Sequence, residues 1–196
     1  MKGRITILFG LILVLAGLVW HAASLRESTQ AALAVQQVVP QLEMSQPEDA
    51  VAETQLPLNL QQNMMMTEKT VDGIGYIGIL EIPALSLKLP VINLWSSKNA
   101  KVAPCRYSGS PYQNDMILCA HNYDSHFGKL DQLTAGDAVM FADMDGNEFI
   151  YQVQESLIIE GTDVETIQSG DWELTLFTCT PGGKMRYCVR CRLLPK

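Results

Sequence analysis

The feature that most constrains the fold is a closely spaced series of short strand-like segments, separated by turn residues, that fills the chain from Val71 onward. The predicted strands are residues 76–82, 85–89, 115–120, 137–141, 148–155, 173–179 and 185–193. Asp145-Gly146 predicts a hairpin turn, and Pro181-Gly182-Gly183 predicts a second turn between strands. Helical content is slight, with short helices predicted at 98–102, 127–133 and 164–168. The pattern predicts an all-β domain that forms a closed or nearly closed β-barrel.

The N-terminal segment is of a different kind. Lys2 and Arg4 precede an uncharged apolar run over residues 5–23, which is close to the roughly 20 residues that cross a bilayer as a helix. The positive-inside rule places the N-terminus in the cytoplasm and the rest of the chain outside the membrane. A cleaved signal peptide is the alternative, but bulky Trp20 and His21 fit its cleavage site poorly. We therefore predict a single-pass transmembrane anchor over residues 1–24.

Residues 25–70 have the composition of a flexible stalk. Pro40, Pro47 and Pro57 are expected to interrupt any long helix, although residues 28–39 are compatible with a short one. The predicted β-barrel domain then occupies residues 71–196. A tether of this kind holds a domain near the membrane while letting it search for partners.

The net charge bears on possible partners, and the cysteine count bears on disulfide pairing. The net charge of −7 argues against a nucleic-acid partner, because no basic face is available to neutralise phosphates. The five cysteines are an odd number, so outside the cytosol at least one thiol is free or is joined to another molecule.

Cys179 is the first candidate for chemistry. It ends an apolar strand and is followed at once by the Pro-Gly-Gly turn, which predicts a thiol at the rim of the barrel. Arg186 lies on the strand that folds back beside it. An arginine there favours the thiolate and can donate to an oxyanion on an attacked carbonyl. The alternative is that Cys179 is a small buried hydrophobic residue, as most cysteines are.

His121 is the second candidate, because it closes another buried strand and enters a loop. A histidine at a strand end is a suitable acid for a leaving amine if it faces the nucleophile. His126, five residues later, is the rival, and spacing alone does not choose between them.

These motifs together resemble the signature of the sortases. The resemblance rests on Thr175–Cys179 (TLFTC) with a following arginine, on Ala120-His121-Asn122, on residues 126–133 (HFGKLDQL) and on the opening residues 78–83 (GILEIP). It spans residues 75–193, and the motifs occur in the order found in that family. The resemblance implies an eight-stranded barrel and a Cys-His-Arg site.

The resemblance also implies which residues form that site. The sortase histidine directly follows the buried strand, so the role passes to His121 rather than His126. The sortase arginine opens the last strand, which favours Arg186 over Arg190 and Arg192, two residues that share its strand parity.

The function implied by the resemblance is that of a membrane-anchored cysteine transpeptidase. Such an enzyme cleaves an LPXTG-like sorting signal on surface proteins and joins the acyl product to an amine of a cell-wall precursor or another protein. No second apolar segment follows the domain, unlike pilin-polymerising members, so cell-wall anchoring is expected. Two alternatives stay open: a cysteine protease on the same scaffold that uses water, and a catalytically silent binding barrel.

The remaining signals predict no cofactor or metal. Cys188 and Cys191 have C-x-x-C spacing, but positions three apart on a strand point to opposite faces, so we predict structural cysteines. The segment 143–147 (DMDGN) lacks the later ligands of a calcium loop. Some sortases bind calcium through acidic loops, and Glu160, Asp163 and Glu165 are the acidic loop residues here. Such residues are usually solvated.

Overall fold

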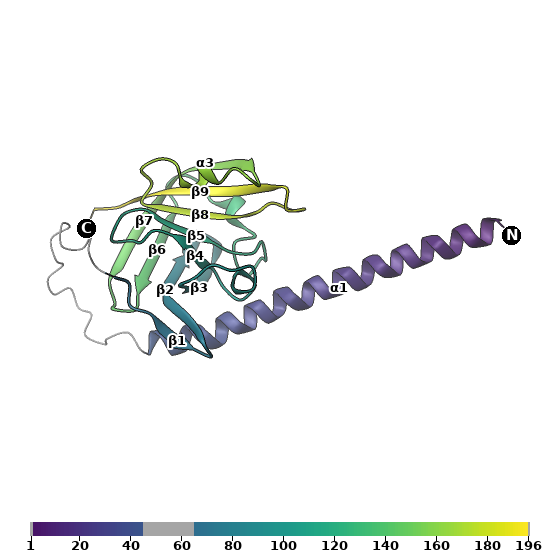
Figure 1. Ribbon diagram of the computed structural model, residues 1–196, viewed down its shortest axis with the longest axis horizontal. Helices are drawn as coiled ribbons and strands as arrows, with labels where there is room; N and C mark the ends of the chain where they lie inside the picture. The colour runs from purple at the N-terminus through teal and green to yellow at the C-terminus, as the bar shows by residue number, and fades with distance from the viewer. Residues whose placement is uncertain (1, 45–64, 196) are drawn as a thin grey trace.

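A computed structural model describes residues 2–44 and 65–195 of the chain. It consists of one long helix, α1, which projects from a barrel of strands (Figure 1). The strands are β1 (Lys69–Val71), β2 (Ile74–Ile82), β3 (Leu87–Ile92), β4 (Cys105–Ser108), β5 (Met116–Cys119), β6 (Ala138–Asp143), β7 (Glu148–Glu160), β8 (Leu174–Cys179) and β9 (Met185–Leu193). The helices are α1 (Lys2–Glu43), α3 (Val164–Gln168) and the single 3-10 turns η1 (Pro83–Leu85), η2 (Asn99–Lys101) and η3 (Leu130–Gln132).

Eight strands close into a barrel. The strand order is β1-β2-β3-β4-β5-β8-β9-β7-β6, and β2 also pairs with β6, which joins the two ends. The short strand β1 lies outside this ring and pairs only with β2. The predicted all-β, eight-stranded barrel with few helices is therefore confirmed.

The core follows from period-2 alternation along the strands. In β6 every second residue is buried, and Phe141 of this strand is fully inaccessible. Tyr76, Leu80 and Tyr151 fill the same interior from β2 and β7. This continuous apolar core fixes the strand register, because a shift by one residue would turn the buried set toward water.

Most predicted elements lie close to the observed ones. Strand β9 and helix α3 have the predicted bounds. Strand β3 begins two residues later than expected, because η1 and a left-handed Ser86 (φ 53°) come first. Strand β7 extends beyond the predicted residue 155 to Glu160, since it pairs with β9 along nearly its whole length.

The first part of the predicted flexible stalk is helical, which is a correction. Helix α1 continues without a break from the apolar run to Glu43, and Pro40 lies inside it. The reason is packing: one stripe of α1 is buried against the barrel, namely Ala31, Val35, Val38, Val39 and Leu42. Residues with this spacing (i, i+4, i+7, i+8, i+11) lie on one face of a helix. Pro40 lies near the end of α1, so the backbone hydrogen bond that proline cannot donate is lost only there. Residues 45–64 of the predicted stalk lie outside the described residues.

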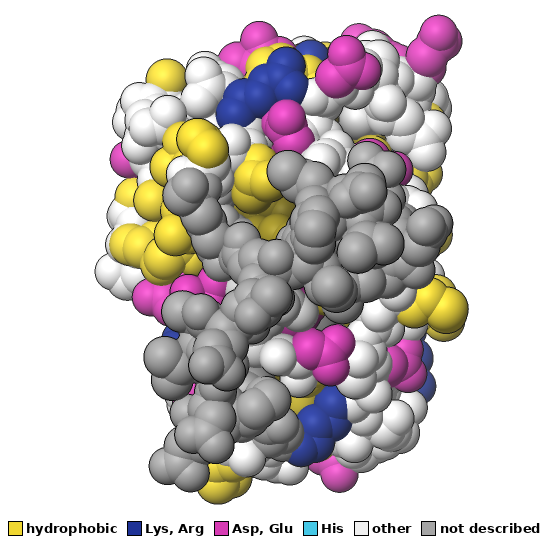
Figure 2. All heavy atoms as spheres, turned by 90° about the vertical axis from the view of Figure 1, so that its left-hand side faces the viewer, with side chains coloured by type: hydrophobic (Ala, Val, Ile, Leu, Met, Phe, Trp, Pro, Cys, Tyr) yellow, Lys and Arg dark blue, Asp and Glu magenta, His cyan; other side chains and the backbone are white. Residues whose placement is uncertain are grey.

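The two halves of α1 differ in environment. The N-terminal half extends away from the barrel (Figure 1) and exposes large apolar side chains such as Phe9, Leu13 and Trp20. The apolar stretch makes α1 long and apolar enough to cross a membrane. Figure 2 shows the face of the molecule on the left-hand side of Figure 1, where acidic, basic and hydrophobic side chains are interspersed.

Candidate active site

Strand register brings the three predicted site residues to one end of the barrel. Strands β5 and β8 are parallel, and Cys119 lies opposite Phe177. His121 and Cys179 lie two residues beyond Cys119 and Phe177 in their two segments. On the other side of β8, Cys179 is directly opposite Arg186 of β9. Because neighbouring strands lie about 4.8 Å apart, the three residues occupy adjacent positions along one rim.

Two hydrogen bonds continue the β5–β8 pairing up to the site. The amide of Ala120 donates to the carbonyl of Phe177 (3.4 Å), and the buried Thr178 hydroxyl donates to the carbonyl of Ala120 (2.9 Å). Ala120 and Thr178 directly precede His121 and Cys179. The two segments that carry these side chains are therefore tied together one residue before each of them.

Cys179 differs from the other cysteines in exposure. It is partly exposed at the end of β8, whereas all the others are buried, and all five are free thiols. Burial raises the thiol pKa of Cys105 and Cys191 to about 12 and that of Cys188 to about 11, and it also raises the pKa of Cys119. A thiolate is the reactive form of cysteine, so these four are poor nucleophiles. This supports the structural role predicted for Cys188 and Cys191.

The two rival histidines have different environments. His126 is fully buried, and this burial, with the nearby His121, lowers its pKa to about 4. His121 is partly exposed at the rim. Its pKa is lowered from the ordinary value by burial and by the positive charge of Lys101, while Asn122 and Glu27 act in the opposite direction. Exposure thus favours His121 as the histidine that a substrate can reach.

The hairpin between β8 and β9 positions Arg186. Gly182 and Gly183 both have positive φ (85° and 73°), which the turn requires and which glycine adopts without strain. The Arg186 guanidinium donates to the carbonyls of Gly183 (2.9 Å) and Met185 (3.1 Å). The guanidinium is thereby held at the turn, while the backbone of Arg186 pairs with that of Cys179.

The two other arginines of β9 have partners elsewhere. Arg190 pairs with Glu155 (2.9 Å) and donates to the carbonyl of Thr166 in α3 (2.7 Å). Arg192 pairs with Glu173 (3.2 Å) and lies over the Trp172 ring at 4.2 Å. These contacts hold the loop between β7 and β8 against the barrel.

Three residues around His121 were not among the predicted site residues: Tyr123, Lys101 and Glu27. The Tyr123 ring stacks on the imidazole, with centroids 4.1 Å apart and an interplanar angle of 18°. The Tyr123 hydroxyl donates to Glu27 of α1 (2.9 Å), and Lys101 of η2 pairs with the same carboxylate (3.2 Å). Tyr123 lies two residues from His121 and was a detectable signal, but Glu27 is 96 residues from Tyr123.

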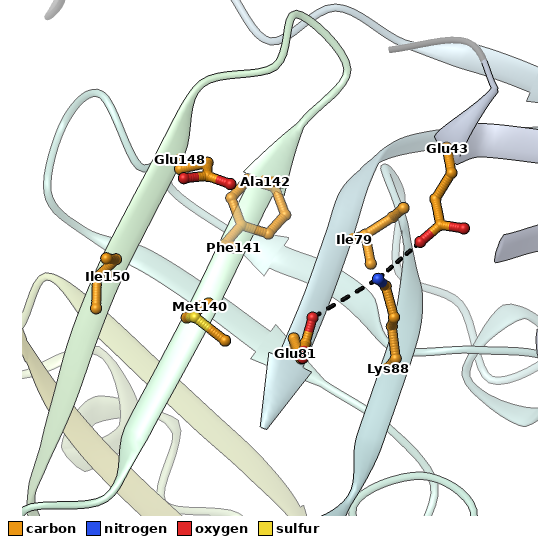
Figure 3. Close-up of a pocket in the computed structure, with 9 residues that line it drawn as sticks. All are labelled: Glu43, Ile79, Glu81, Lys88, Met140, Phe141, Ala142, Glu148 and Ile150. Atoms are coloured by element: carbon orange, nitrogen blue, oxygen red, sulfur yellow. Dashed lines mark ion pairs between the residues drawn. The ribbon is translucent and has the colours of Figure 1, made fainter. Parts of the chain in front are cut away.

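A pocket on other strands of the barrel is separate from this rim. It has a volume of about 160 Å³ and is lined by residues of β2, β3, β6 and β7 together with Glu43 of α1 (Figure 3). Lys88 lies between Glu43 (2.7 Å) and Glu81 (3.7 Å). None of the three predicted site residues lines it.

The acidic segments considered for calcium have structural contacts. The Asp163 carboxylate accepts from the amide of Thr166 (3.0 Å) and caps α3. Asp143 is fully buried and accepts from the amides of Asp145 (2.9 Å) and Asn147 (2.8 Å), as expected for the predicted hairpin. Among the described residues no group of three or more His, Cys, Asp or Glu side chains is placed to hold a metal ion.

Comparison with known proteins agrees with this geometry. Residues 80–194 match the family model of the sortase domain. Sortase D of Bacillus subtilis (strain 168) is 29% identical over 108 residues, which are 53% of this chain and 54% of that protein. The chain thus matches about half the length of this curated relative.

Solved sortase structures share the fold. Sortase C of Streptococcus pneumoniae is 21% identical with a TM-score of 0.62, covering 82% of this chain and 97% of that one. Sortase C1 of Streptococcus agalactiae is 25% identical with a TM-score of 0.57, covering 74% and 79%. The Clostridium perfringens Sortase D5 transpeptidase is 15% identical with a TM-score of 0.60, covering 85% and 99%.

The matched family region contains the whole rim described above. It includes strands β5, β8 and β9, the accessible Cys179, and His121 and Arg186 on either side of it. The match covers more than half of the 196 residues, and the closed barrel agrees with it. The chain belongs to the sortase family.

Proposed function

We propose that the protein is a cysteine transpeptidase that cleaves an LPXTG-like sorting signal and transfers the acyl product to an amine. One observation carries the proposal: of the five free cysteines only Cys179 is accessible, and it lies at the end of β8 between Arg186 on β9 and the segment after β5 that carries His121. The thiol provides a nucleophile, the imidazole an acid–base group, and the guanidinium a donor to the oxyanion.

The first half-reaction forms a thioester. The Cys179 thiolate attacks the carbonyl carbon of the threonine-like residue, and the Arg186 guanidinium with nearby backbone amides stabilises the oxyanion. The C–N bond then breaks, and His121 as imidazolium gives its proton to the departing glycine amine. The products are an acyl-enzyme and neutral His121.

The second half-reaction reverses the proton transfer. The incoming amine attacks the thioester carbonyl, His121 takes its proton, and the C–S bond breaks to return the Cys179 thiolate. Acceptors are an amine of a cell-wall precursor or of another protein. Burial and the charge of Lys101 lower the pKa of His121, which makes its imidazolium a stronger acid toward the departing amine in the first step.

The proposal includes membrane attachment through α1. Lys2 and Arg4 precede the apolar run, which favours a cytoplasmic N-terminus and an extracellular barrel. The exposed apolar side chains of the projecting half of α1 are suited to a lipid environment. Sorting-signal-bearing surface proteins would then meet the enzyme at the outer face of the cell membrane.

A peptide assay tests the proposal. A library of LPXTG-like peptides is incubated with the full chain in detergent micelles, with and without triglycine, and the products are identified by mass spectrometry. We expect cleavage and a triglycine-ligated product with the wild type and neither with Cys179→Ala. Cys188→Ala is the matched control, and it should retain transfer.

Other results would select the alternatives. Cleavage without ligation would indicate a cysteine protease. No cleavage, together with Cys179 alkylation no faster than that of a free cysteine, would indicate a silent binding barrel. Cleavage that survives Cys179→Ala would overturn both enzymatic proposals.

A further inference from the structure

Helix α1 contacts the candidate site through Glu27, just after the apolar run. The Glu27 carboxylate accepts from the Tyr123 hydroxyl (2.9 Å) and pairs with the Lys101 ammonium, whose nitrogen lies 3.2 and 3.3 Å from its two oxygens. The hydrogen bonds from Tyr123 and Lys101 lower the pKa of Glu27. Burial and the hydrogen bond to Glu27 raise the pKa of Tyr123 to about 12. We call Glu27, Lys101 and Tyr123 the Glu27 cluster.

Both barrel members of the Glu27 cluster are coupled to His121. The Tyr123 ring is stacked face to face on the imidazole at 4.1 Å. Lys101 adjoins Ala100 in η2, and the carbonyl of Ala100 accepts from the His121 amide (3.2 Å). Glu27 therefore fastens two elements that contact His121 from different directions, one through its ring and one through its backbone.

The loop after His121 leaves Tyr123 little freedom. The carbonyl of Tyr123 accepts from the amides of His126 and Gly128, both at 2.9 Å. A Cβ at Gly128 would lie 2.7 Å from the carbonyl oxygen of Asn122, so only glycine allows this close return. The backbone of Tyr123 is thereby fixed, and its hydroxyl is directed to α1.

The side chain of Asn122 hydrogen-bonds to His121, but one nitrogen of the His121 ring lacks such a partner among the described residues. Its Nδ1 is buried, and no hydrogen-bond partner for it is present in the described parts of the chain. Stacking restricts the plane of a ring, and a ring held in one plane keeps its proton-bearing nitrogen aimed in one direction.

From these contacts we infer that Glu27 is a positioning residue for His121, so that docking of the membrane-proximal turn of α1 on the barrel orders the imidazole beside Cys179. The consequence for transpeptidation rests on the proposed function. The coupling between Glu27 and His121 does not.

The charges around His121 give the inference a readout that is independent of activity. The titratable groups that act on or contact the ring are Glu27 from α1, Lys101 from η2, and Tyr123 and His126 from its own loop. Glu27 raises the His121 pKa and Lys101 lowers it. Neutralising Glu27 removes the first effect and leaves Lys101 uncompensated, so the pKa of His121 should fall.

Histidine ring NMR of the full chain in detergent micelles measures that pKa. Glu27→Gln is compared with Glu43→Gln, which removes the other α1 carboxylate that pairs with a barrel lysine. Cys179→Ala serves as the background, so that the thiol does not titrate with the imidazole. We expect a lower His121 pKa and a shifted His121 resonance in Glu27→Gln, and neither change in Glu43→Gln.

Tyr123 variants separate stacking from the link to α1. Tyr123→Phe keeps the ring and loses the hydrogen bond, so we expect it to reproduce the Glu27→Gln resonance shift in direction. In the peptide assay with Cys179 present, both variants should lower kcat on the order of 10-fold with KM little changed, because on this inference the change acts through the orientation of His121 and not through peptide binding.

The outcomes distinguish this inference from the proposed function. An unchanged His121 pKa and resonance in Glu27→Gln would overturn the inference even if the wild type is an active transpeptidase. A shifted His121 in Glu27→Gln, with a wild type that transfers nothing, would uphold the coupling and defeat the proposed function. A shift as large in Glu43→Gln would show a general effect of helix charge and would also overturn it.

Discussion

Helix α1 touches the barrel in two regions, and each contact includes a glutamate paired with a lysine. At one, Glu43 reaches Lys88 beside the pocket of β2, β3, β6 and β7 (Figure 3), and the buried stripe of α1 ends next to it at Leu42. At the other, Glu27 reaches Lys101 and Tyr123 beside His121. Both ion pairs are about half exposed.

The difference lies in what surrounds each pair. Around Leu42 the apolar stripe of α1 packs on the barrel, and the removal of this apolar surface from water stabilises the docked helix. Around Glu27 there is little apolar burial, and the contact instead meets the groups that flank the candidate acid–base residue. The same helix is thus held in one region and acts on the site in the other. The following predictions test this division, beginning with the largest expected effect.

Leu42→Ala removes a fully buried side chain from the region that holds the helix. The free energy of unfolding should fall by about 2–5 kcal/mol, because the change loses apolar burial and leaves a cavity. Urea denaturation in detergent micelles measures it, with the half-exposed Leu33→Ala of the same helix as a control. The His121 resonance should shift as well. A fall in stability with an unmoved His121 would show that the two regions are independent.

Acid should weaken the region near the site through His126. Its folded pKa of about 4 lies below its ordinary value of 6.5, so between these pH values the unfolded chain binds the proton more tightly. The stability is complete above pH 6.5 and falls as the pH decreases toward 4, by about 3 kcal/mol. The measurement is the free energy of unfolding against pH for wild type and His126→Gln. Equal slopes for the two proteins would contradict the prediction.

Thr178→Val tests the tie between the ends of β5 and β8. It removes the buried hydrogen bond to the Ala120 carbonyl and leaves that oxygen without this donor. The free energy of unfolding should fall by about 1–3 kcal/mol, and transfer activity should fall with it because His121 and Cys179 are no longer tied. Thr162→Val, at an exposed loop position, is the control. Unchanged activity would show that the two ends are held by other contacts.

Glu43→Gln should have the smallest effect. A half-exposed ion pair contributes about 1 kcal/mol or less, and Lys88 keeps Glu81 as a partner. Thermal unfolding at low and high salt measures the loss, which should shrink as salt is added. A loss greater than that of Leu42→Ala would reverse the assignment of which force holds the helix.

Local patterns were sufficient to predict most of the barrel. Strand β9 begins after the Gly182-Gly183 turn, and α3 begins after Asp163, which caps it, so both were predicted with their observed bounds. The rim was predictable only in part from local pattern, which placed Cys179 at a strand end beside a turn, whereas the choice of His121 over His126 and of Arg186 over the other arginines of β9 came from the resemblance to sortases. Their catalytic roles remain a prediction that the peptide assay tests.

Long-range contacts could not be read from local patterns. Pro40 predicts a break in a helix, yet α1 continues to Glu43 because Leu42 and the residues before it bury one face on β3 and β2. Glu27 has no local signal that distinguishes it from any exposed glutamate. Its meaning depends on Tyr123 and Lys101, which the fold brings to it from 96 and 74 residues away.

The unbroken course of α1 has a consequence for where catalysis takes place. If residues 5–23 cross the bilayer as proposed, Glu27 follows the last of them by four residues, a rise of about 6 Å along a straight helix. Such a rise corresponds to the depth of the lipid headgroups. A rigid spacer of this length would set the rim beside the outer leaflet, so that a sorting signal would have to reach the lipid surface to meet Cys179.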